Sequence, residues 1–490
     1  MKNMKTDSRR AFLRNSGAAL LAGYAFSNRT GLAQTVARPD AARYQSVTIN
    51  THEFSPTGAI QERLDLPKDW KIDTVHMVGA KNTPLTSAQI LQKLRTPIGS
   101  KSLRDIAAGK KNACITFDDA SRPTYFGLVA EQVINELNAA GIDDDHILFI
   151  GAVGSHTEMH SYCAMGKLGQ VVYKRCPWET HNNLDNLVKV GKTGFNNMIE
   201  LNGYFAKADV KILMGQIRNH AGYMFSGGPK GIIPGIVSVD TIFYNHCVVG
   251  GVNVRTSRGY EGDTREQLKE ASVPLFDKLG YAQPYNRRLD ALEAARLAGV
   301  DFSVSIIQNG TQDVIDLICG DVNESHLAAC EVANNIQCYD HIVKAGEFDV
   351  VITNNYPTTQ AGIRYGTPRE GGISIAVVQT PLTNQIHKLS QRGSWNQTAW
   401  HDINYSPRKQ ANYRQIMVSQ YAGKKEHYNS NSVEIYPTWD KVLPILEQNN
   451  KSGASVLLYP YNGNAWAKFQ PRTAAAPAGG AAGTAAGAAR

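Results

Sequence analysis

Two histidines and one lysine lie close together in a glycine-rich part of the chain. The segment from His220 to Lys230 contains the turn Ser226-Gly227-Gly228, and His246 follows sixteen residues after the lysine. Histidine changes charge near neutral pH and is the commonest metal ligand, and a lysine amine can form a covalent bond to a cofactor. Gly227 and Gly228 would let the backbone approach a bulky ligand. The segment is therefore either a reactive site or a loop with two structural histidines and a surface lysine.

A second loop with chemical potential follows the strand candidate at residues 113–117. It contains Asp118-Asp119 and then Arg122-Pro123-Thr124. A helix that begins at Pro123 would direct free backbone N–H groups toward the loop, and Arg122 is suited to bind a carboxylate or a phosphate. The alternative is a structural ion pair between Arg122 and one of the two aspartates.

A third loop carries His156 and His160, which are four residues apart. Two histidines with this spacing can share a helix face as zinc ligands, but Glu158 is not placed as in a His-Glu-x-x-His zinc hydrolase. We therefore do not favour a zinc hydrolase.

The elements around these loops alternate between short β-branched runs and amphipathic stretches. This alternation predicts an α/β fold of two α/β domains with largely parallel sheets, and an active site in the cleft between them. The charged stretch 256–270 divides the chain into an N-terminal α/β catalytic and cofactor domain at 45–265 and a C-terminal α/β domain at 270–470. The predicted strands are 113–117, 146–151, 210–213, 303–308, 314–319 and 348–353, and the predicted helices are 124–140 and 324–335.

The first 33 residues predict export. Ser8-Arg9-Arg10-Ala11-Phe12-Leu13 precedes an apolar run from Gly17 to Phe26 and a small-residue site at Ala33, which is typical of a twin-arginine signal peptide. The run is about half of the roughly 20 residues that a membrane span needs, so we expect no stable membrane anchor in the mature form. A chance arginine pair in a Sec signal is the alternative. We expect the twin-arginine export machinery as a partner, folding before export, and a periplasmic location.

Charge, tail composition and cysteines limit the other functions. The segment 1–33 carries six Lys or Arg and one Asp, so its removal lowers the formal net charge from +8 to +3 and argues against a nucleic-acid partner. Residues 473–490 are almost entirely Ala and Gly and predict a disordered tail. The chain has seven cysteines and no CxxC pair, so most should be buried thiols, with an oxidised pair among Cys319, Cys330 and Cys338 as the alternative.

Together these motifs resemble the nickel-pincer-nucleotide-dependent lactate racemase family, which includes 2-hydroxyacid racemases and epimerases. The resemblance extends from about residue 60 to at least 360, and its most specific part is the spacing of ten residues from His220 to Lys230 and sixteen from Lys230 to His246. The segments that carry it are Leu64–Trp70, Leu103–Ala107, Phe117–Thr124, Gly154–His156, His220–His246 and Phe302–Cys330.

The resemblance implies a role for each matching residue. Lys230 would join a nickel-pincer nucleotide, Ni(II) pyridinium-3,5-bisthiocarboxylic acid mononucleotide, and His246 would be the protein ligand of the nickel. His156 and His220 would be the acid/base pair, and Arg122 would hold the substrate carboxylate. Asp119, Gly227 and Gly228 would support the cofactor.

One stretch departs from the family pattern. Tyr356-Pro357-Thr-Thr-Gln360 keeps a substrate-binding motif with Gln360, but Thr367 occupies the position at which the family has a lysine. Arg364 either replaces that charge or faces solvent. The departure puts lactate itself in doubt and makes a larger or differently charged 2-hydroxyacid, such as a sugar acid or an aromatic acid, a plausible substrate. Trp395 and Trp400 either line such a pocket or have a core or surface role.

The resemblance implies inversion of the 2-carbon of a 2-hydroxyacid by removal and return of hydride. Loss of hydride together with the hydroxyl proton leaves a neutral ketone, whereas abstraction of the α-proton would create a dianion-like centre. Two alternatives stay open: a 2-hydroxyacid oxidoreductase, which would release stoichiometric keto acid, and an exported organic-acid binding protein, which would bind its ligand without nickel or a coloured cofactor.

Overall fold

The computed structural model describes most of the chain after residue 41. The described residues are 42–51, 60–122, 124–156, 158–220, 223–249, 286–356, 366–379, 412–420, 433–450, 452–461 and 465–467. Among them, no helix is long and apolar enough to cross a membrane. The chain divides into a small unit, residues 1–46 with 65–68, and a large unit that contains all the candidate site residues. The predicted signal peptide, tail and 256–270 boundary lie outside the described residues, so the division at 45–265 and 270–470 stays a prediction.

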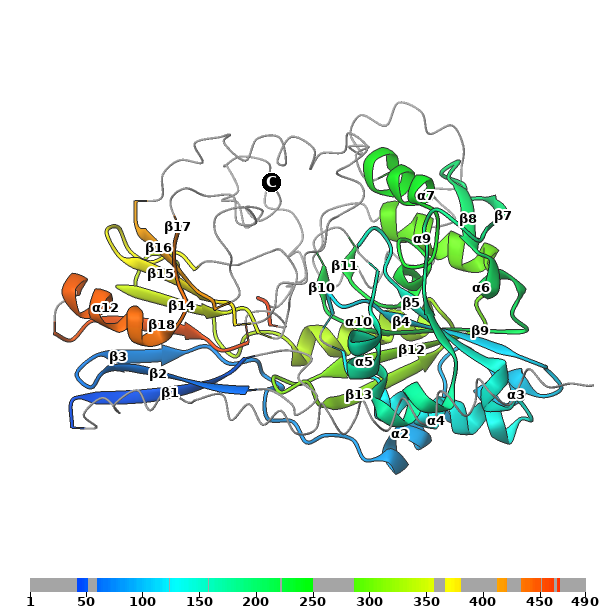
Figure 1. Cartoon of the computed structure of the whole chain (residues 1–490), viewed down its shortest axis with the longest axis horizontal. Helices are drawn as coiled ribbons and strands as arrows, with labels where there is room; N and C mark the ends of the chain where they lie inside the picture. Colours follow the sequence, from blue (N-terminus) through cyan, green and yellow to red (C-terminus); the bar gives the residue numbers. More distant parts are fainter. Residues whose placement is uncertain are drawn as a thin grey trace, which may run out of the picture. The chain divides into compact units, whose positions relative to one another are not determined.

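The sheet that carries the candidate loops at Asp118 and at His156 has six strands in the order β13-β12-β9-β4-β5-β6 (Figure 1). Neighbouring strands are parallel except for the antiparallel pair β12–β13. Its strands are β4 (Ala113–Asp118), β5 (Ile147–Ala152), β6 (Trp178–Thr180), β9 (Val210–Gln216), β12 (Phe302–Gln308) and β13 (Val314–Gly320).

A second six-stranded sheet, in the order β17-β16-β15-β14-β18-β3, is parallel throughout. The mixed α/β class with largely parallel sheets is therefore confirmed. The strands are β3 (Lys71–Thr74), β14 (Val350–Asn354), β15 (Ile373–Val377), β16 (Arg414–Val418), β17 (Val433–Tyr436) and β18 (Ser455–Tyr459). Three two-stranded sheets pair β1 (Tyr44–Thr51) with β2 (Ile60–Pro67), β7 (Leu187–Lys192) with β8 (Met198–Asn202), and β10 (Asn219–His220) with β11 (Met224–Phe225).

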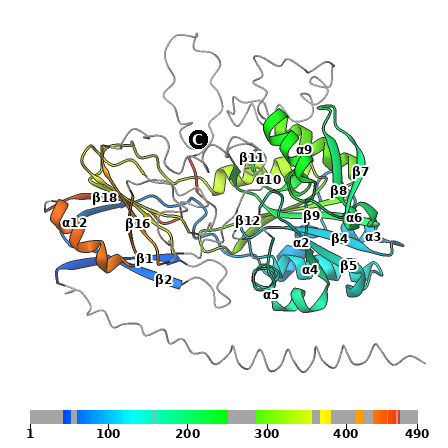
Figure 2. The same ribbon diagram turned by 45° about the horizontal axis from the view of Figure 1, so that its top comes forward.

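Helices cover both faces of the first sheet because its central strands are apolar on both sides. In β4, Ile115 and Phe117 join one core cluster and Cys114 joins another, as the two-residue period of a strand requires. In Figures 1 and 2, α2 and α4 lie on one side of the strands and α9 on the other. The helices are α2 (Ser87–Leu94), α3 (Leu103–Ala107), α4 (Gly127–Ala139), α5 (Ser161–Arg175), α6 (Gly203–Lys207), α7 (Val239–Phe243), α9 (Asn286–Leu297), α10 (Glu324–Ile336) and α12 (Leu443–Asn449).

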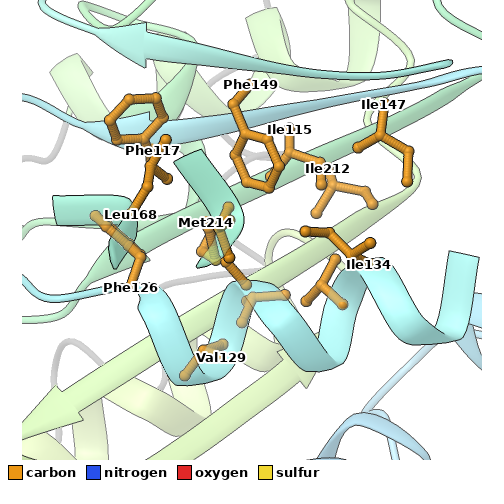
Figure 3. Packing of buried hydrophobic residues seen from close by; sticks show 14 of the residues in the cluster. Ile115, Phe117, Phe126, Val129, Ile134, Ile147, Phe149, Leu168, Ile212 and Met214 are labelled. Carbon is orange, nitrogen blue, oxygen red and sulfur yellow. The ribbon is translucent and has the colours of Figure 1, made fainter. Parts of the chain in front are cut away.

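The core cluster between α4 and the first sheet combines aliphatic side chains with several phenylalanine rings (Figure 3). The ring of Phe117 on β4 meets the edges of Phe126 and Phe149, with centroids 6.0 and 6.3 Å away. Burial of each such side chain stabilises the fold by roughly 1.5–3 kcal/mol. This packing fixes the ends of β4 and β5, from which the candidate loops leave the sheet.

All the predicted strands and helices exist, with shifts of a few residues at their ends. The largest shift is in the helix predicted to begin at Pro123, which instead begins at Gly127. Two hydrogen bonds hold the preceding residues as a loop: Thr124 Oγ1 donates to Asp118 Oδ2 at 3.0 Å, and the Phe126 N–H donates to the Lys167 carbonyl at 2.7 Å. The expectation that a helix N-terminus opens onto Arg122 is therefore wrong.

Candidate active site

The loops after β4 and β5 meet because these two strands are neighbours in the sheet. The His156 Nδ1–H donates to Asp119 Oδ2 across this junction. The other carboxylate oxygen, Oδ1, accepts hydrogen bonds from the Ser121 N–H at 3.1 Å and the Ser121 hydroxyl at 2.5 Å. Asp119 is only 5 % exposed, so it orients the His156 ring from a fixed position.

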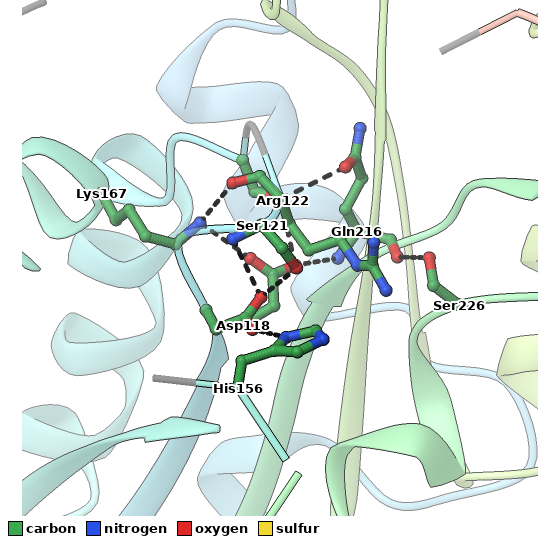
Figure 4. A network of polar contacts seen from close by, with 9 residues as sticks. Asp118, Ser121, Arg122, His156, Lys167, Gln216 and Ser226 are labelled. Atoms are coloured by element: carbon green, nitrogen blue, oxygen red, sulfur yellow. Dashed lines mark hydrogen bonds and ion pairs between the residues drawn. The ribbon is translucent and has the colours of Figure 1, made fainter. Parts of the chain in front are cut away.

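A buried lysine, Lys167, binds the same loop (Figure 4). Lys167 on α5 is fully buried, and its ammonium lies 2.9 Å from Asp118 Oδ1 and donates to the Arg122 carbonyl at 2.8 Å. Asp118 Oδ2 accepts from the Gln216 N–H on β9 at 3.0 Å. Asp118 thus pairs with Lys167 and Asp119 with His156, and Lys167 anchors the backbone from which Arg122 extends.

The ring of Tyr223 lies among three of the predicted site residues. The Lys230 Nζ is 3.8 Å from the centroid of the Tyr223 ring. The centroid of the His220 ring is 5.5 Å away and that of the His246 ring is 5.9 Å away. Tyr223 is 1 % exposed. The structure therefore brings His220, Lys230 and His246 together, as their spacing predicts.

The charges around His220 and Lys230 favour their neutral forms. Burial lowers the pKa of His220 well below its usual value, and Lys230, Arg122, Arg218 and His246 lower it further. Burial also lowers the pKa of Lys230 well below its usual value, with help from Arg122 and Arg287 and opposition from Asp119. These electrostatic interactions link the Asp119 loop to the lysine. An uncharged amine is the nucleophilic form of lysine.

Asp119 has the opposite bias. Burial alone would raise the pKa of its carboxyl, but His156, Arg122 and Ser121 together hold the pKa well below the usual range. Asp119 is therefore a carboxylate at neutral pH and accepts a hydrogen bond from the Nδ1–H of His156, which places the lone pair of the neutral imidazole on Nε2.

His246 has the orientation expected of a metal ligand. It lies in the π-helical turn η3 (Tyr244–Val249), and its Nδ1–H donates to the Ile242 carbonyl at 3.1 Å. A carbonyl oxygen can only accept, so the lone pair of the neutral ring lies on Nε2. A backbone carbonyl that binds the second ring nitrogen is the usual support of a histidine ligand. Arg287 donates to the His246 carbonyl at 2.9 Å and holds the turn itself.

The backbone conformation and the close packing around it explain why positions 227 and 228, before Lys230, are glycines. Gly227 has φ +79° and Gly228 has φ +51°, a region that favours glycine. A Cβ on Gly227 would lie 2.5 Å from Ile217 Cδ1, and one on Gly228 would lie 2.5 Å from the His326 ring. The space beside each glycine thus holds protein side chains, and their predicted role toward a cofactor stays a prediction.

The Gly228→Ala variant is expected to lose roughly 2–4 kcal/mol of unfolding free energy, because it adds a clash with His326 to the strain of positive φ. Gly109→Ala is the matched control: Gly109 has φ +74° and no atom within 4 Å of its added Cβ. It should lose only about 1–2 kcal/mol. Urea titration of both variants gives the difference, and equal losses would show that His326 moves aside at no cost.

The side chain of His326 holds the turn Ser226-Gly227-Gly228 through a hydrogen bond. Its ring is 1 % exposed, and Nε2 donates to the Ser226 carbonyl at 3.0 Å. Arg288 donates to Nδ1 at 3.3 Å, so this nitrogen is the acceptor and the ring is neutral. Burial and Arg288 lower the pKa of His326 to about 3, while the hydrogen bond to Ser226 opposes them.

This depressed pKa predicts a loss of stability in acid. An unfolded histidine takes up a proton below about pH 6.5, whereas folded His326 stays neutral until about pH 3. The unfolding free energy should therefore fall as the pH drops from about 6.5 toward 3, by up to roughly 5 kcal/mol from this residue. Urea titrations across this range should give a shallower pH dependence for His326→Gln, and an identical dependence would contradict the assignment.

Some predicted residues are not part of this arrangement. His160 is the N-cap of α5, where its Nδ1 accepts from the Cys163 N–H at 3.3 Å, and His156 lies before the helix. His156 and His160 therefore do not share a helix face as zinc ligands. The described residues contain no metal-binding group of three His, Cys, Asp or Glu. Gln360, Arg364, Trp395 and Trp400 lie outside the described residues. Six cysteines are buried thiols: Cys114, Cys163, Cys176, Cys319, Cys330 and Cys338.

Sequence reasoning missed three residues that shape the site: Lys167, Tyr223 and His326. Tyr223 stands inside the His220–Lys230 segment, so its position was available but its central placement was not. Lys167 and His326 occur in helices with no local signal. Their contribution is visible only in the structure, where each is a buried charged or polar side chain that binds a loop of the candidate site.

Comparisons with known proteins show which proteins this chain is similar to. Residues 57–257 match the family described as the lactate racemase N-terminal domain. The lactate racemase of Thermoanaerobacterium thermosaccharolyticum is 26 % identical over 312 residues, which cover 62 % of this chain and 67 % of that protein. The lactate racemase of Lactiplantibacillus plantarum is 25 % identical over 316 residues, which cover 62 % and 68 %.

Two solved structures share the fold. The lactate racemase apoprotein from Thermoanaerobacterium thermosaccharolyticum aligns with a TM-score of 0.56 and 20 % identity, over 86 % of this chain and 100 % of that one. A protein from Thermotoga maritima aligns with a TM-score of 0.53 and 16 % identity, over 78 % and 98 %. The chain thus carries a segment that matches the lactate racemase N-terminal domain and is similar to proteins named lactate racemase.

Proposed function

We propose that the protein is a racemase or epimerase that inverts the 2-carbon of a 2-hydroxyacid. The observation that carries the proposal is the convergence of His220, Lys230 and His246 around one buried ring, with the Asp119–His156 pair electrostatically linked to them. The similarity to proteins named lactate racemase supports the reaction class.

The donor set suits a nickel-pincer nucleotide. Lys230 has a pKa far below the usual range, as an amine that forms a covalent bond needs. His246 has its Nδ1 fixed by a carbonyl, which suits binding of Ni(II) through Nε2. Lys230 would tether the group and His246 would bind its metal. When bound, the cofactor supplies an acceptor for the hydrogen of the substrate's 2-carbon.

The two histidines would move the hydroxyl proton. His156 presents Nε2 as a base while Asp119 holds Nδ1–H and stabilises the imidazolium that forms. His220 is neutral at physiological pH because of its depressed pKa, so it too can accept a proton. A base on each side of the substrate lets either enantiomer lose its hydroxyl proton.

Arg122 would hold the substrate carboxylate. Its guanidinium lowers the pKa of both Lys230 and His220, which places positive charge beside the groups that react. Lys167 fixes its carbonyl, so the side chain extends from an anchored backbone. Such a fork orients a carboxylate through two parallel hydrogen bonds, and the substrate can then turn its 2-carbon while one end stays bound. Gln360 and Arg364 are proposed as further substrate contacts.

Chiral analysis of a panel of 2-hydroxyacids with the holo-protein tests the proposal. At least one acid, including sugar acids and aromatic acids in the panel, should be inverted at the 2-carbon. The protein should contain about one nickel per chain and a mass adduct on Lys230. Stoichiometric keto acid would instead indicate an oxidoreductase. Binding of an acid by a protein without nickel or adduct would indicate an organic-acid binding protein.

We also propose export through the twin-arginine machinery to the periplasm. Arg9-Arg10 and the apolar run that follows support it. A metal-bearing cofactor bound to Lys230 is a physical reason to fold before export, because that pathway carries folded proteins.

A further inference from the structure

The ring of Tyr223 lies beside three of the predicted site residues, His220, Lys230 and His246. One face of its ring lies 3.8 Å from Lys230 Nζ. The His220 ring meets it edge-on, at an interplanar angle of 80°, and the His246 ring is tilted at 55°. A single rigid ring therefore lies next to the amine and both imidazoles.

A buried polar network fixes the hydroxyl end of this ring. The Tyr223 hydroxyl donates to Asn245 Oδ1, and Asn245 Nδ2 donates to Asp290 Oδ2 at 2.7 Å. Asp290 is fully buried and accepts from Thr193 Oγ1 at 2.6 Å and from Asn197 Nδ2 at 2.8 Å. The Tyr223 hydroxyl is thus held by an asparagine that is itself bound by a buried carboxylate.

The network also joins the two segments that carry the reactive groups. Tyr223 follows His220 by three residues in the β10–β11 hairpin, and Asn245 immediately precedes His246 in η3. The hydrogen bond between Tyr223 and Asn245 therefore connects the hairpin with His220 to the turn with His246. Met224, next to Tyr223, has φ +65° and is fully buried. A bulky residue in this region is strained and persists only where its surroundings enforce it.

We propose that Tyr223 is a positioning residue: its anchored ring holds the Lys230 amine, the His220 imidazole and the His246 imidazole at fixed mutual distances. The inference rests on the proposed function, which makes these three groups the tether, an acid/base group and the metal ligand. The ring gives the amine a face on which to lie in either charge state, because aromatic faces attract ammonium groups and pack against neutral ones. Small displacements of reacting groups cost large factors in rate.

The test compares three holo-proteins: Tyr223→Phe, which keeps the ring, Tyr223→Leu, which removes it, and Phe205→Leu. Phe205 is the matched control because it is fully buried in the same apolar cluster as Tyr223 and lies on α6. The readouts are the Lys230 adduct by mass, kcat and KM per chain with adduct, the melting temperature, and the ring signals of His220 and His246 by NMR, assigned with His→Gln variants.

Tyr223→Leu should lower kcat per chain with adduct by about ten- to a hundred-fold while KM changes less, because a shift near 1 Å in a reacting group costs that much. Tyr223→Phe keeps the ring but loses the hydrogen bond to Asn245, so its kcat should lie between those of wild type and Tyr223→Leu. Phe205→Leu should stay within about three-fold of wild type despite its own loss of melting temperature. The ring signals of both histidines should move in Tyr223→Leu and far less in Phe205→Leu. If Tyr223→Leu does not fold, Tyr223→Met keeps the buried volume without the ring and replaces it.

Equal kcat values for the Tyr223→Leu and Phe205→Leu proteins would overturn the positioning role. A wild-type protein that carries no adduct and inverts no 2-hydroxyacid would instead refute the proposed function. In that case the histidine signals still decide on Tyr223: signals that move only when the ring is removed support the fixed spacing, and unchanged signals contradict it.

Discussion

The Lys230→Met variant is expected to lose the mass adduct and all inversion activity while its melting temperature stays the same or rises. Methionine keeps the length of the side chain but has no amine that could form a covalent bond. The stability follows from the depressed pKa of Lys230: burial and two guanidinium groups disfavour its charged form, so an apolar side chain removes an unfavourable group. Intact-mass measurement, chiral analysis and thermal unfolding check the three parts.

Lys189→Met is the control for this prediction. Its side chain on β7 is 70 % exposed and lies 3.8 Å from Glu200, so it should keep adduct, activity and stability, since an exposed pair contributes little. Retention of both the adduct and the activity by Lys230→Met would refute the role of Lys230 and, with it, the proposed cofactor chemistry.

The Asp119→Asn variant is expected to lower kcat by about 10²- to 10⁴-fold with the cofactor still bound. An asparagine can offer its NH₂ group to Nδ1 of His156, which moves the ring proton to Nε2 and removes the base. A carboxylate that only accepts from Nδ1–H prevents this exchange. Because two enantiomers have equal free energy, kcat/KM for a racemised substrate must fall by the same factor in both directions. Progress curves from each enantiomer measure it.

Asp143→Asn serves as the control, because Asp143 is exposed and its side chain makes no cap hydrogen bond. It should be indistinguishable from wild type. If Asp119→Asn has unchanged kcat, Asp119 supports the loop through Ser121 alone and His156 is not the base.

Much of the fold could be predicted because its signals are local. The apolar run Ala113–Phe117 is buried on both faces of the sheet, and the helix predicted at 324–335 is α10. The helix start at Gly127 could not be predicted. Pro123 is a strong local signal, but the Lys167 carbonyl, more than forty residues along the chain, binds the Phe126 N–H and keeps the loop open.

The candidate site residues were also singled out from the sequence, through the spacing of His220, Lys230 and His246 and the polar loops at Asp119 and His156. The spacing is a useful signal because each of these groups must reach the same site from its own turn of the chain. It says which residues meet, but not what lies between them.

Only the folded chain shows what holds those residues in place. His326 donates to the carbonyl of Ser226, which lies 100 residues earlier in the chain, and the Gln216 N–H donates to Asp118, which lies 98 residues earlier. Tyr223 is central because Asn245 and Asp290 fix its hydroxyl. Contacts of this range depend on strand order and helix packing, which no local pattern encodes. Residue types and their spacing thus predicted the candidate site residues. The contacts that hold these residues in place depend on packing between distant segments.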